Sequence, residues 1–335
     1  MRRTKLVTKA HRQLSIEMET PLVVLDETIM RENCARWAHA AAAAGIRPRP
    51  HFKGHKTLEI LEHQAQLGAV GAEFGRLSDI ERVVACGWSG ECVLAWCHYK
   101  PAMWTRVAEM VAAGQSLIVD VDSPAIVDGY STAAEQLGVV IPIRIQVNTG
   151  LRGCSPSDVP ALVEHCAKRL GVRLAGVTGY ASWYNENGGR NWEPPEVAGR
   201  REAELLVSVR DSLVSAGLAD RLPVCGGSTP VAEGTRAVRG VDEIGGTTYI
   251  LSDWNMAQLG LAPTSTLAVE VIVSVTNSWP GGFEVNAGIT TFGERYAYPG
   301  LRRPLIASTR SGDLVLTQTG LTRAVGEVVR GDLLP

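Results

Sequence analysis

Short apolar segments alternate with longer amphipathic ones over the first 250 residues of the chain. The short segments are rich in β-branched residues and predict buried strands. The eight predicted strands cover residues 48–53, 69–74, 92–96, 116–121, 141–147, 174–179, 222–225 and 243–251. Between them, apolar positions recur with helical spacing, as in residues 57–67, 77–86, 104–113 and 160–170.

Strands that alternate with helices in this way predict parallel β–α–β units. Eight such units close a (β/α)8 barrel of the TIM type. The competing architecture is an open, doubly wound sheet, which binds a nucleotide through a glycine-rich first turn. The first turn of this chain has no such glycine pattern. We therefore expect an α/β protein with a (β/α)8 TIM-type barrel over residues 20–262.

The pattern changes beyond residue 262. Residues 265–275 alternate like a strand, and further short apolar segments follow at 283–287, 305–309 and 314–319, separated by Gly and Pro turns. No convincing helix interrupts them. Residues 263–335 are therefore expected to form a small antiparallel β domain, appended to the barrel. The N-terminal arm, residues 1–19, is expected to pair with it.

Composition narrows the functional class. The chain has 335 residues, 45% hydrophobic and 20% charged, with a net charge of -2, which is ordinary for a soluble globular protein. This balance predicts no nucleic-acid partner and no membrane surface. No apolar segment reaches the roughly 18 residues of a membrane span. Seven scattered cysteines without a CxxC pair predict free thiols in a reducing cytoplasm.

The clearest chemistry lies in the segment RPRPHFKGHK at residues 47–56. Lys53 stands at the end of the first predicted strand, with His51 and His55 two residues away on either side and Lys56 close by. A lysine that forms a Schiff base must lose its proton near neutral pH, so it needs burial or nearby positive charge. We expect the two histidines and Lys56 to supply that charge. Taken alone, the segment is equally compatible with a basic surface loop.

Two glycine-containing segments lie at the ends of the seventh and eighth predicted strands. Backbone N–H groups beside glycines, and hydroxyl groups, bind anions. Barrels often hold phosphate in the loops after these two strands. Either segment alone could be an ordinary turn, but with Lys53 they predict a phosphorylated cofactor that carries an aldehyde. The candidate cofactor-binding residues here are Gly226, Gly227, Ser228, Thr229, Gly246, Thr247 and Tyr249.

These motifs resemble the fold-type III pyridoxal-phosphate enzymes. The branch that looks most similar is the D-serine dehydratase/D-threonine aldolase family, which is related to the N-terminal domain of alanine racemase. The resemblance extends from about residue 20 to 320. The family motif RPHxKxHK carries the cofactor on its first lysine, which is Lys53 in this chain. His51 matches the first histidine of the motif. The resemblance thus implies pyridoxal 5'-phosphate as the cofactor.

The resemblance implies two further cofactor contacts. Tyr180 stands where the family has a tyrosine near the cofactor ring. The segment NTGLRGC at residues 148–154 is similar to a family loop whose arginine reaches the pyridoxal 3'-oxygen, which here would be Arg152. This loop departs from the family pattern, because it begins with asparagine in place of aspartate and its arginine comes one position early.

A second departure concerns metal binding. Family dehydratases and aldolases hold a divalent metal through a His-x-Cys pair near the C-terminus, but the last histidine here is His165 and the last cysteine is Cys225. A metal site needs ligands of suitable type and geometry. The sequence therefore predicts no metal ligands, which leaves either a truncated chain or a reaction without that metal.

The resemblance implies a lyase of aldolase or dehydratase type. Its expected substrate is a small, D-configured β-hydroxy-α-amino acid that reacts through a Schiff base on Lys53. Lys53 is the expected base on one face, and Tyr180, His55 or His98 could be the second base. The alternatives are a metal-independent racemase or epimerase, a non-catalytic pyridoxal-phosphate carrier, and a degenerate relative without cofactor. Relatives are commonly dimers, so we expect a homodimer.

Two aromatic segments have open interpretations. The loop at residues 183–192 could be a substrate lid or an ordinary surface loop. Tyr296 and Tyr298 could reach the active site of a partner subunit or lie on the surface. His98 fits a packed or exposed histidine better than an acid or base.

Overall fold

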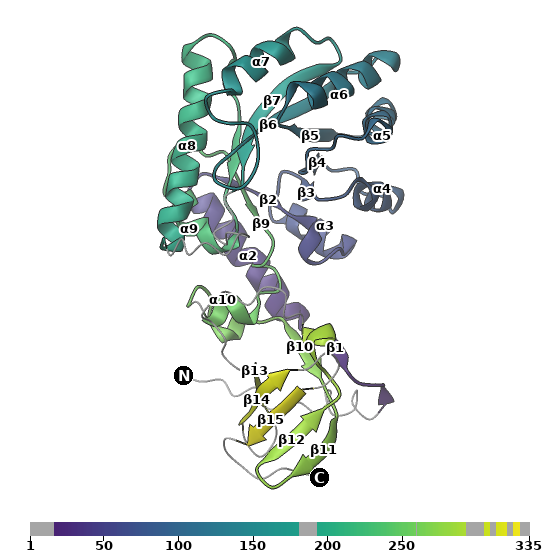
Figure 1. Ribbon diagram of the computed structural model, residues 1–335, viewed down its shortest axis with the longest axis vertical. Helices are drawn as coiled ribbons and strands as arrows, with labels where there is room; N and C mark the ends of the chain where they lie inside the picture. The colour runs from purple at the N-terminus through teal and green to yellow at the C-terminus, as the bar shows by residue number, and fades with distance from the viewer. Residues whose placement is uncertain are drawn as a thin grey trace. The chain divides into compact units, whose positions relative to one another are not determined.

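The chain forms two compact units. One comprises residues 31–250, and the other comprises the remaining described residues (Figure 1). The computed structural model describes residues 17–180, 193–258, 260–292, 305–308, 313–319 and 324–328.

The larger unit is built on one parallel sheet. Its strand order is β2-β9-β8-β7-β6-β5-β4-β3, and a parallel bridge between His51 and Glu73 links the two outermost strands into a barrel. The prediction of an eight-stranded barrel is therefore confirmed. The strands are β2 (Arg47–Pro50), β3 (Ala72–Phe74), β4 (Cys92–Leu94), β5 (Leu117–Val121), β6 (Ile141–Val147), β7 (Val172–Gly179), β8 (Val224–Gly226) and β9 (Glu243–Gly246).

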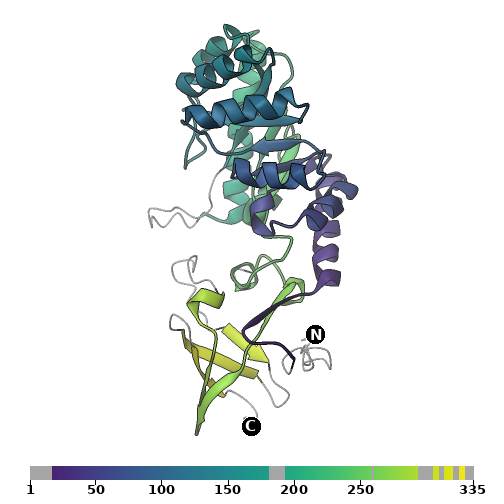
Figure 2. The ribbon, with the colours of Figure 1, turned by 90° about the vertical axis from the view of Figure 1, so that its right-hand side faces the viewer.

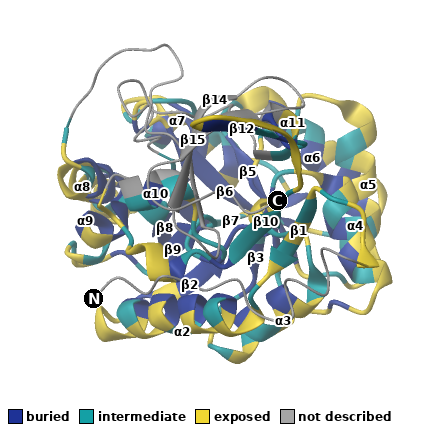
Figure 3. Cartoon of the chain, turned by 90° about the horizontal axis from the view of Figure 1, so that it is seen from below, coloured by how far each residue is buried: buried dark blue, intermediate teal, exposed yellow. Residues whose placement is uncertain are grey.

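Helices surround these strands, with their exposed residues facing outward (Figure 3). In α4, the apolar residues Leu77, Ile80 and Val83 recur every three positions and are buried, so one face of the helix packs inward. Prolines occupy the first turn of α5, α6, α7 and α8, where their missing N–H costs no hydrogen bond. The helices are α2 (Glu27–Ala43), α3 (Leu58–Gln66), α4 (Leu77–Ala85), α5 (Pro101–Ala112), α6 (Pro124–Gln136), α7 (Val159–Ala167), α8 (Pro195–Ser215) and α9 (Ala232–Arg236).

Alternate residues of each strand face different surroundings. In β6, Ile143 and Ile145 belong to the main apolar core, which also contains buried residues of the helices. Arg144 lies between them and points to the opposite face of the sheet. Its guanidinium contacts Glu73 on β3, three strands away, so this contact crosses the barrel interior. The apolar core thus lies between sheet and helices, and the barrel interior is polar.

Ion pairs occupy that interior. Arg144 Nε donates to Asp120 Oδ1 at 2.8 Å, and Arg144 Nη2 donates to Glu73 Oε1 at 2.9 Å. Arg49 forms a second ion pair, in which its Nε atom lies 2.5 Å from Glu243 Oε2. Buried charges are tolerated when they are paired and hydrogen-bonded. These contacts therefore join β3, β5 and β6 in one group, and β2 and β9 in another.

The smaller unit is antiparallel, as the sequence predicts (Figure 2). Strands β1 (Leu22–Leu25) and β10 (Val269–Ile272) form a two-stranded sheet. A five-stranded sheet has the order β11-β12-β15-β14-β13. Its strands are β11 (Val275–Trp279), β12 (Gly282–Val285), β13 (Leu305–Ser308), β14 (Asp313–Thr319) and β15 (Ala324–Val328).

Several details of this unit differ from the sequence prediction. The single strand expected at 265–275 is divided between β10 and β11, and β15 was not predicted. Two short helices also occur. α10 (Trp254–Gln258) lies before residue 262, and α11 (Ile289–Phe292) lies beyond it, where no helix was expected. Relative to the expected boundaries at 20 and 262, the unit takes in β1 and residues 251–262. The arm residues 1–16 lie outside the described residues.

Two further observations concern the cysteines and the helices. All seven cysteines are free thiols. Within the described ranges, no helix combines the length and the apolar character needed to cross a bilayer.

We predict that Arg144→Met lowers the free energy of unfolding by about 3–5 kcal/mol, because it leaves two buried carboxylates without a counter-charge. The matched control is Arg106→Met. Its ion pair with Glu81 is exposed, with 44% and 35% side-chain accessibility, and its loss should cost less than about 1 kcal/mol. Urea denaturation of both variants measures the difference, and equal losses would contradict the importance of the interior ion pairs.

Candidate active site

Lys53 lies directly after the point where the barrel closes. β2 ends at Pro50, His51 makes the bridge to β3, and Lys53 follows in the 3-10 turn η1 (Phe52–Gly54). The Nδ1 atom of His51 accepts a hydrogen bond from the Lys53 N–H at 3.2 Å, and this caps the turn. Lys53 itself is exposed. The turn therefore presents the lysine at the carboxyl end of the strands, where barrels carry their active sites.

Gly54 makes this turn possible. A Cβ atom at that position would lie 2.1 Å from Thr247 Oγ1. This distance is too short for any side chain to fit there. The same Thr247 hydroxyl donates a hydrogen bond to the His51 carbonyl oxygen at 3.1 Å. The lysine turn and the loop after β9 are therefore in direct contact.

Three side chains from other strand ends gather near Lys53. The ring centroid of Tyr180, after β7, is 5.6 Å from Lys53 Nζ. Arg152, after β6, has its Cζ atom 5.8 Å from the same ring and 4.1 Å from the ring of Trp96. Such distances are typical of cation–π contacts. The structure thus brings together the predicted residues Lys53, Tyr180 and Arg152.

Trp96 was not predicted as a site residue. It follows β4 and is 45% exposed, although tryptophan is a mostly buried residue type. The available signal was its position just past a predicted strand, in the segment Trp96-Cys97-His98-Tyr99. That signal became meaningful only once Arg152 was found against the indole ring.

The surroundings lower the pKa of Lys53. The side chain reaches solvent, but the protein atoms packed around it remove part of its hydration, and this desolvation is the main cause. Glu73 acts in the opposite direction, and Arg152 lowers the pKa further. Burial also lowers the pKa of His51 to about 3 and that of His55 to about 4. Both imidazoles are therefore neutral near pH 7.

This overturns part of the sequence interpretation. The two histidines were expected to supply positive charge to Lys53, but they are neutral because they are buried. Lys56 lies 3.8 Å from Asp79, measured from Nζ to Oδ2. The cation that lowers the pKa of Lys53 is Arg152.

The other candidate bases have structural contacts of their own. His55 Nδ1 lies 3.1 Å from the Thr57 carbonyl oxygen, and its ring packs edge-on against Phe52 with centroids 5.2 Å apart. The His98 carbonyl oxygen accepts a hydrogen bond from Trp104 Nε1 at 2.7 Å. Of the three candidates, Tyr180 is the one whose ring lies against Lys53, with its centroid 5.6 Å from Nζ.

The two predicted anion-binding loops meet each other. Thr229 Oγ1 accepts hydrogen bonds from the backbone N–H groups of Thr247 and Tyr249, each at 3.2 Å. Gly227 has a φ of +83°, which favours glycine, and it lies just before Ser228 and Thr229. Together with the contact between Thr247 and His51, this places both loops beside the lysine turn.

The side chain of Tyr249 contacts residues of two helices. Its hydroxyl accepts a hydrogen bond from Gln64 Nε2 at 2.8 Å, and its ring stacks on Trp37 with centroids 4.2 Å apart. Burial raises its pKa well above the ordinary value. The side chain is therefore packed between α2 and α3.

These residues fit pyridoxal phosphate. In the part of the chain that the structure describes, Arg152 Nε is a buried donor without a hydrogen-bond partner, so it can donate to an anionic ring oxygen. Lys53 offers an exposed amine of lowered pKa for an aldehyde. The loops that begin at Gly226 and Gly246 offer glycines and hydroxyls for a phosphate group.

Residues 25–240 match the family model described as "Alanine racemase, N-terminal domain". The chain belongs to this family. The resemblance inferred from the sequence motifs is therefore confirmed.

Two relatives of this chain are named as a dehydratase and an aldolase. The chain is 28% identical over 268 residues to the D-threo-3-hydroxyaspartate dehydratase of Delftia sp. (strain HT23), covering 78% of this chain and 68% of the dehydratase. It is also 28% identical over 244 residues to the D-threonine aldolase of Arthrobacter sp, covering 70% of this chain and 62% of the aldolase. The solved Delftia dehydratase has a TM-score of 0.81 at 23% identity, over 95% of this chain and 86% of that one, which establishes the shared fold.

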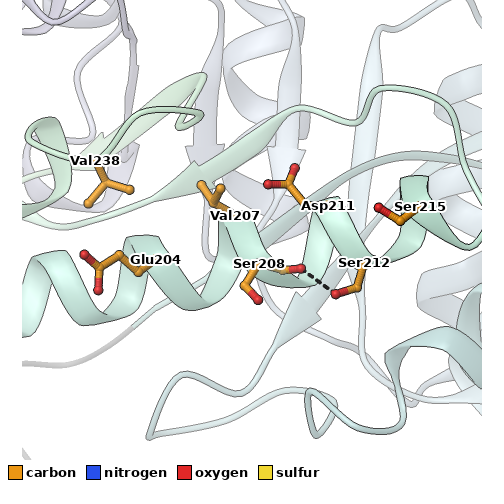
Figure 4. Close-up of a pocket in the computed structure, with 7 residues that line it drawn as sticks. All are labelled: Glu204, Val207, Ser208, Asp211, Ser212, Ser215 and Val238. Carbon is orange, nitrogen blue, oxygen red and sulfur yellow. Dashed lines mark hydrogen bonds between the residues drawn. The ribbon is translucent and has the colours of Figure 1, made fainter.

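Among the described residues, no group of three or more His, Cys, Asp or Glu side chains is arranged to hold a metal ion. A hollow of about 460 Å³ lies along α8 (Figure 4), where the Ser212 hydroxyl donates to the Ser208 carbonyl oxygen at 2.8 Å. Its lining has no amine, imidazole or thiol. The loop at 183–192, Tyr296 and Tyr298 lie outside the described residues.

The low pKa of His51 predicts acid sensitivity. Its folded-state pKa of about 3 lies below the ordinary 6.5, so the unfolded chain takes up this proton first as the pH falls. The stability contributed by neutral His51 is full above about pH 6.5 and is lost towards pH 3, by on the order of a few kcal/mol. Urea midpoints at pH 7.5 and 4.5 measure the loss.

The control compares two histidines. His51→Asn, whose Oδ1 can still accept the Lys53 N–H, should flatten this pH dependence. His39→Asn, at an exposed position of α2, should leave it unchanged. Equal slopes in the wild type and in His51→Asn would contradict the assignment.

Proposed function

We propose that this protein is a pyridoxal-phosphate-dependent lyase of the aldolase or dehydratase type. Its substrate would be a small, D-configured β-hydroxy-α-amino acid. The observation that carries this proposal is the exposed amine of Lys53, with its lowered pKa, beside Tyr180 and Arg152 at the carboxyl end of the barrel.

The relatives support the substrate class. The dehydratase and the aldolase act, by their names, on D-threo-3-hydroxyaspartate and D-threonine. Both compounds are D-amino acids with a hydroxyl group on the β-carbon. The shared chemistry is therefore cleavage of a bond next to the α-carbon of such an amino acid.

The residues around Lys53 would hold the cofactor by three kinds of contact. Lys53 would bond the aldehyde carbon of the cofactor, and Arg152 Nε would donate a hydrogen bond to the oxygen on the cofactor ring. His51 caps the lysine turn by accepting a hydrogen bond from the Lys53 N–H. The loops at 226–229 and 246–247 receive the phosphate, with Thr229 holding the two loops together.

When bound, the cofactor acts as an electron sink for negative charge at the substrate α-carbon. The chain must then move protons. The lowered pKa of Lys53 lets its amine exist in the neutral form, so Nζ can accept a proton from the substrate on its own side. Tyr180, whose ring lies 5.6 Å from Nζ, is our candidate for the second proton-transfer group, ahead of His55.

A near-visible absorbance spectrum tests the cofactor and its lysine. We expect a yellow band in the wild type that is lost in Lys53→Ala, and borohydride should fix the cofactor to the peptide containing Lys53. Lys56→Ala is the control, because this lysine lies against Asp79, and it should keep the band. A wild type that stays colourless with added pyridoxal phosphate would overturn the proposal.

Product analysis tests the reaction. D- and L-threonine, serine and 3-hydroxyaspartate are supplied with and without zinc or manganese. Keto-acid release from the D-isomers identifies a dehydratase, and aldehyde release identifies an aldolase. A change of chirality without cleavage would instead favour the racemase or epimerase alternative, and no turnover would favour a carrier. The metal arms decide whether a divalent ion is required.

We further propose a cytoplasmic homodimer. The free state of all seven cysteines supports a reducing compartment, and the dimer rests on the family resemblance. Light scattering during size-exclusion chromatography measures the mass, for which twice 35.9 kDa is expected.

A further inference from the structure

Glu73 lies directly beneath the lysine turn. Its backbone forms the parallel bridge with His51, two residues before Lys53. Its side chain points into the barrel interior and is only 13% exposed. The carboxylate thus approaches the active site from the buried side, and no sequence motif indicated it.

The surrounding side chains hold this carboxylate in place. Glu73 Oε1 accepts a hydrogen bond from Arg144 Nη2 at 2.9 Å, and Cys225 Sγ lies 3.8 Å from the same oxygen. Arg144 is itself bound to Asp120 through Nε at 2.8 Å and Nη2 at 3.2 Å. Because the guanidinium is held at two points, Glu73 has little freedom to move.

The carboxylate is negatively charged at neutral pH. Burial alone would raise its pKa, but Arg144 and, to a smaller extent, Arg49 hold the pKa below its ordinary value. The charged and titratable groups around it are Arg144, His51, Arg49, Asp120, Cys225 and Lys53.

Lys53 experiences two opposing charges. Glu73 favours the protonated amine and Arg152 disfavours it, while His51, the third group around Lys53, is neutral. Glu73 is the one negative charge among these neighbours. It is therefore the counter-charge available to a protonated Nζ.

We propose that Glu73 is a positioning residue whose carboxylate stabilises the protonated state of the Lys53 nitrogen from inside the barrel. The inference deepens the proposed function and rests on it for its consequence in turnover. When Nζ accepts a substrate proton, its lone pair forms the new N–H bond and the nitrogen gains one positive charge. The electrons of the broken bond stay with the substrate. Glu73 lowers the free-energy cost of the positive charge on Nζ.

The test compares Glu73→Gln with Asp120→Asn in the full-length chain. Both substitutions remove one buried carboxylate bound to Arg144, but Asp120 is not among the charged neighbours of Lys53. The first readout is the pH midpoint at which the visible band of the loaded protein changes. The second is the pH dependence of Lys53 acylation in the cofactor-free chain, followed by peptide mass.

We expect Glu73→Gln to move both midpoints to lower pH by about one unit. Asp120→Asn should move them by much less. An unchanged midpoint in Glu73→Gln, or equal shifts in the two variants, would overturn the inference.

Two complications have defined answers. If Glu73→Gln fails to fold, Glu73→Asp takes its place, because it keeps the negative charge but moves it away from Lys53. A smaller shift of the midpoints in the same direction would support the inference. Unchanged midpoints would overturn it. If the wild type shows no visible band, the proposed function fails, and the acylation midpoints alone decide the role of Glu73.

Discussion

The contact of Arg144 with Asp120 and Glu73 is the interaction on which the rest of this structure depends. One guanidinium inside the barrel joins strands β3, β5 and β6. Buried charges are costly unless each has a partner, so the three side chains constrain one another and, with them, the strands. Since Glu73 also bridges to His51 where the barrel closes, the same interaction determines where the chain leaves β2 and turns towards Lys53.

At the active-site end of the barrel, this rigid group of charges influences the pKa of one amine, that of Lys53. Protein atoms and Arg152 lower the pKa of Lys53, and Glu73 opposes them. The amine is therefore neither an ordinary surface lysine nor a fully neutral one. Such a balance suits a nitrogen that must bond an aldehyde and also hold a proton. Trp96 and Tyr180 contribute by holding the Arg152 guanidinium near their rings.

Much of this could be predicted from local patterns. Six of the eight barrel strands contain β-branched residues, whereas β2 (RPRP) and β3 (AEF) contain none. RPHFKGHK and the glycine loops resemble family motifs strongly enough to identify the family. The errors have physical causes. Residues 265–275 alternate without interruption, so the division between β10 and β11 left no sequence signal. The histidines looked like sources of charge because their burial cannot be seen in a sequence.

The sequence by itself determined the barrel, the family and the lysine, because strand periodicity and motif chemistry are encoded in adjacent residues. Only the tertiary structure decided which charges surround that lysine. Glu73 lies within β3, and Trp96, Arg152 and Tyr180 follow three other strands, so only closure of the barrel brings these four residues near Lys53. The pKa of an amine depends on burial and on charges within a few ångströms, and both are properties of the folded chain.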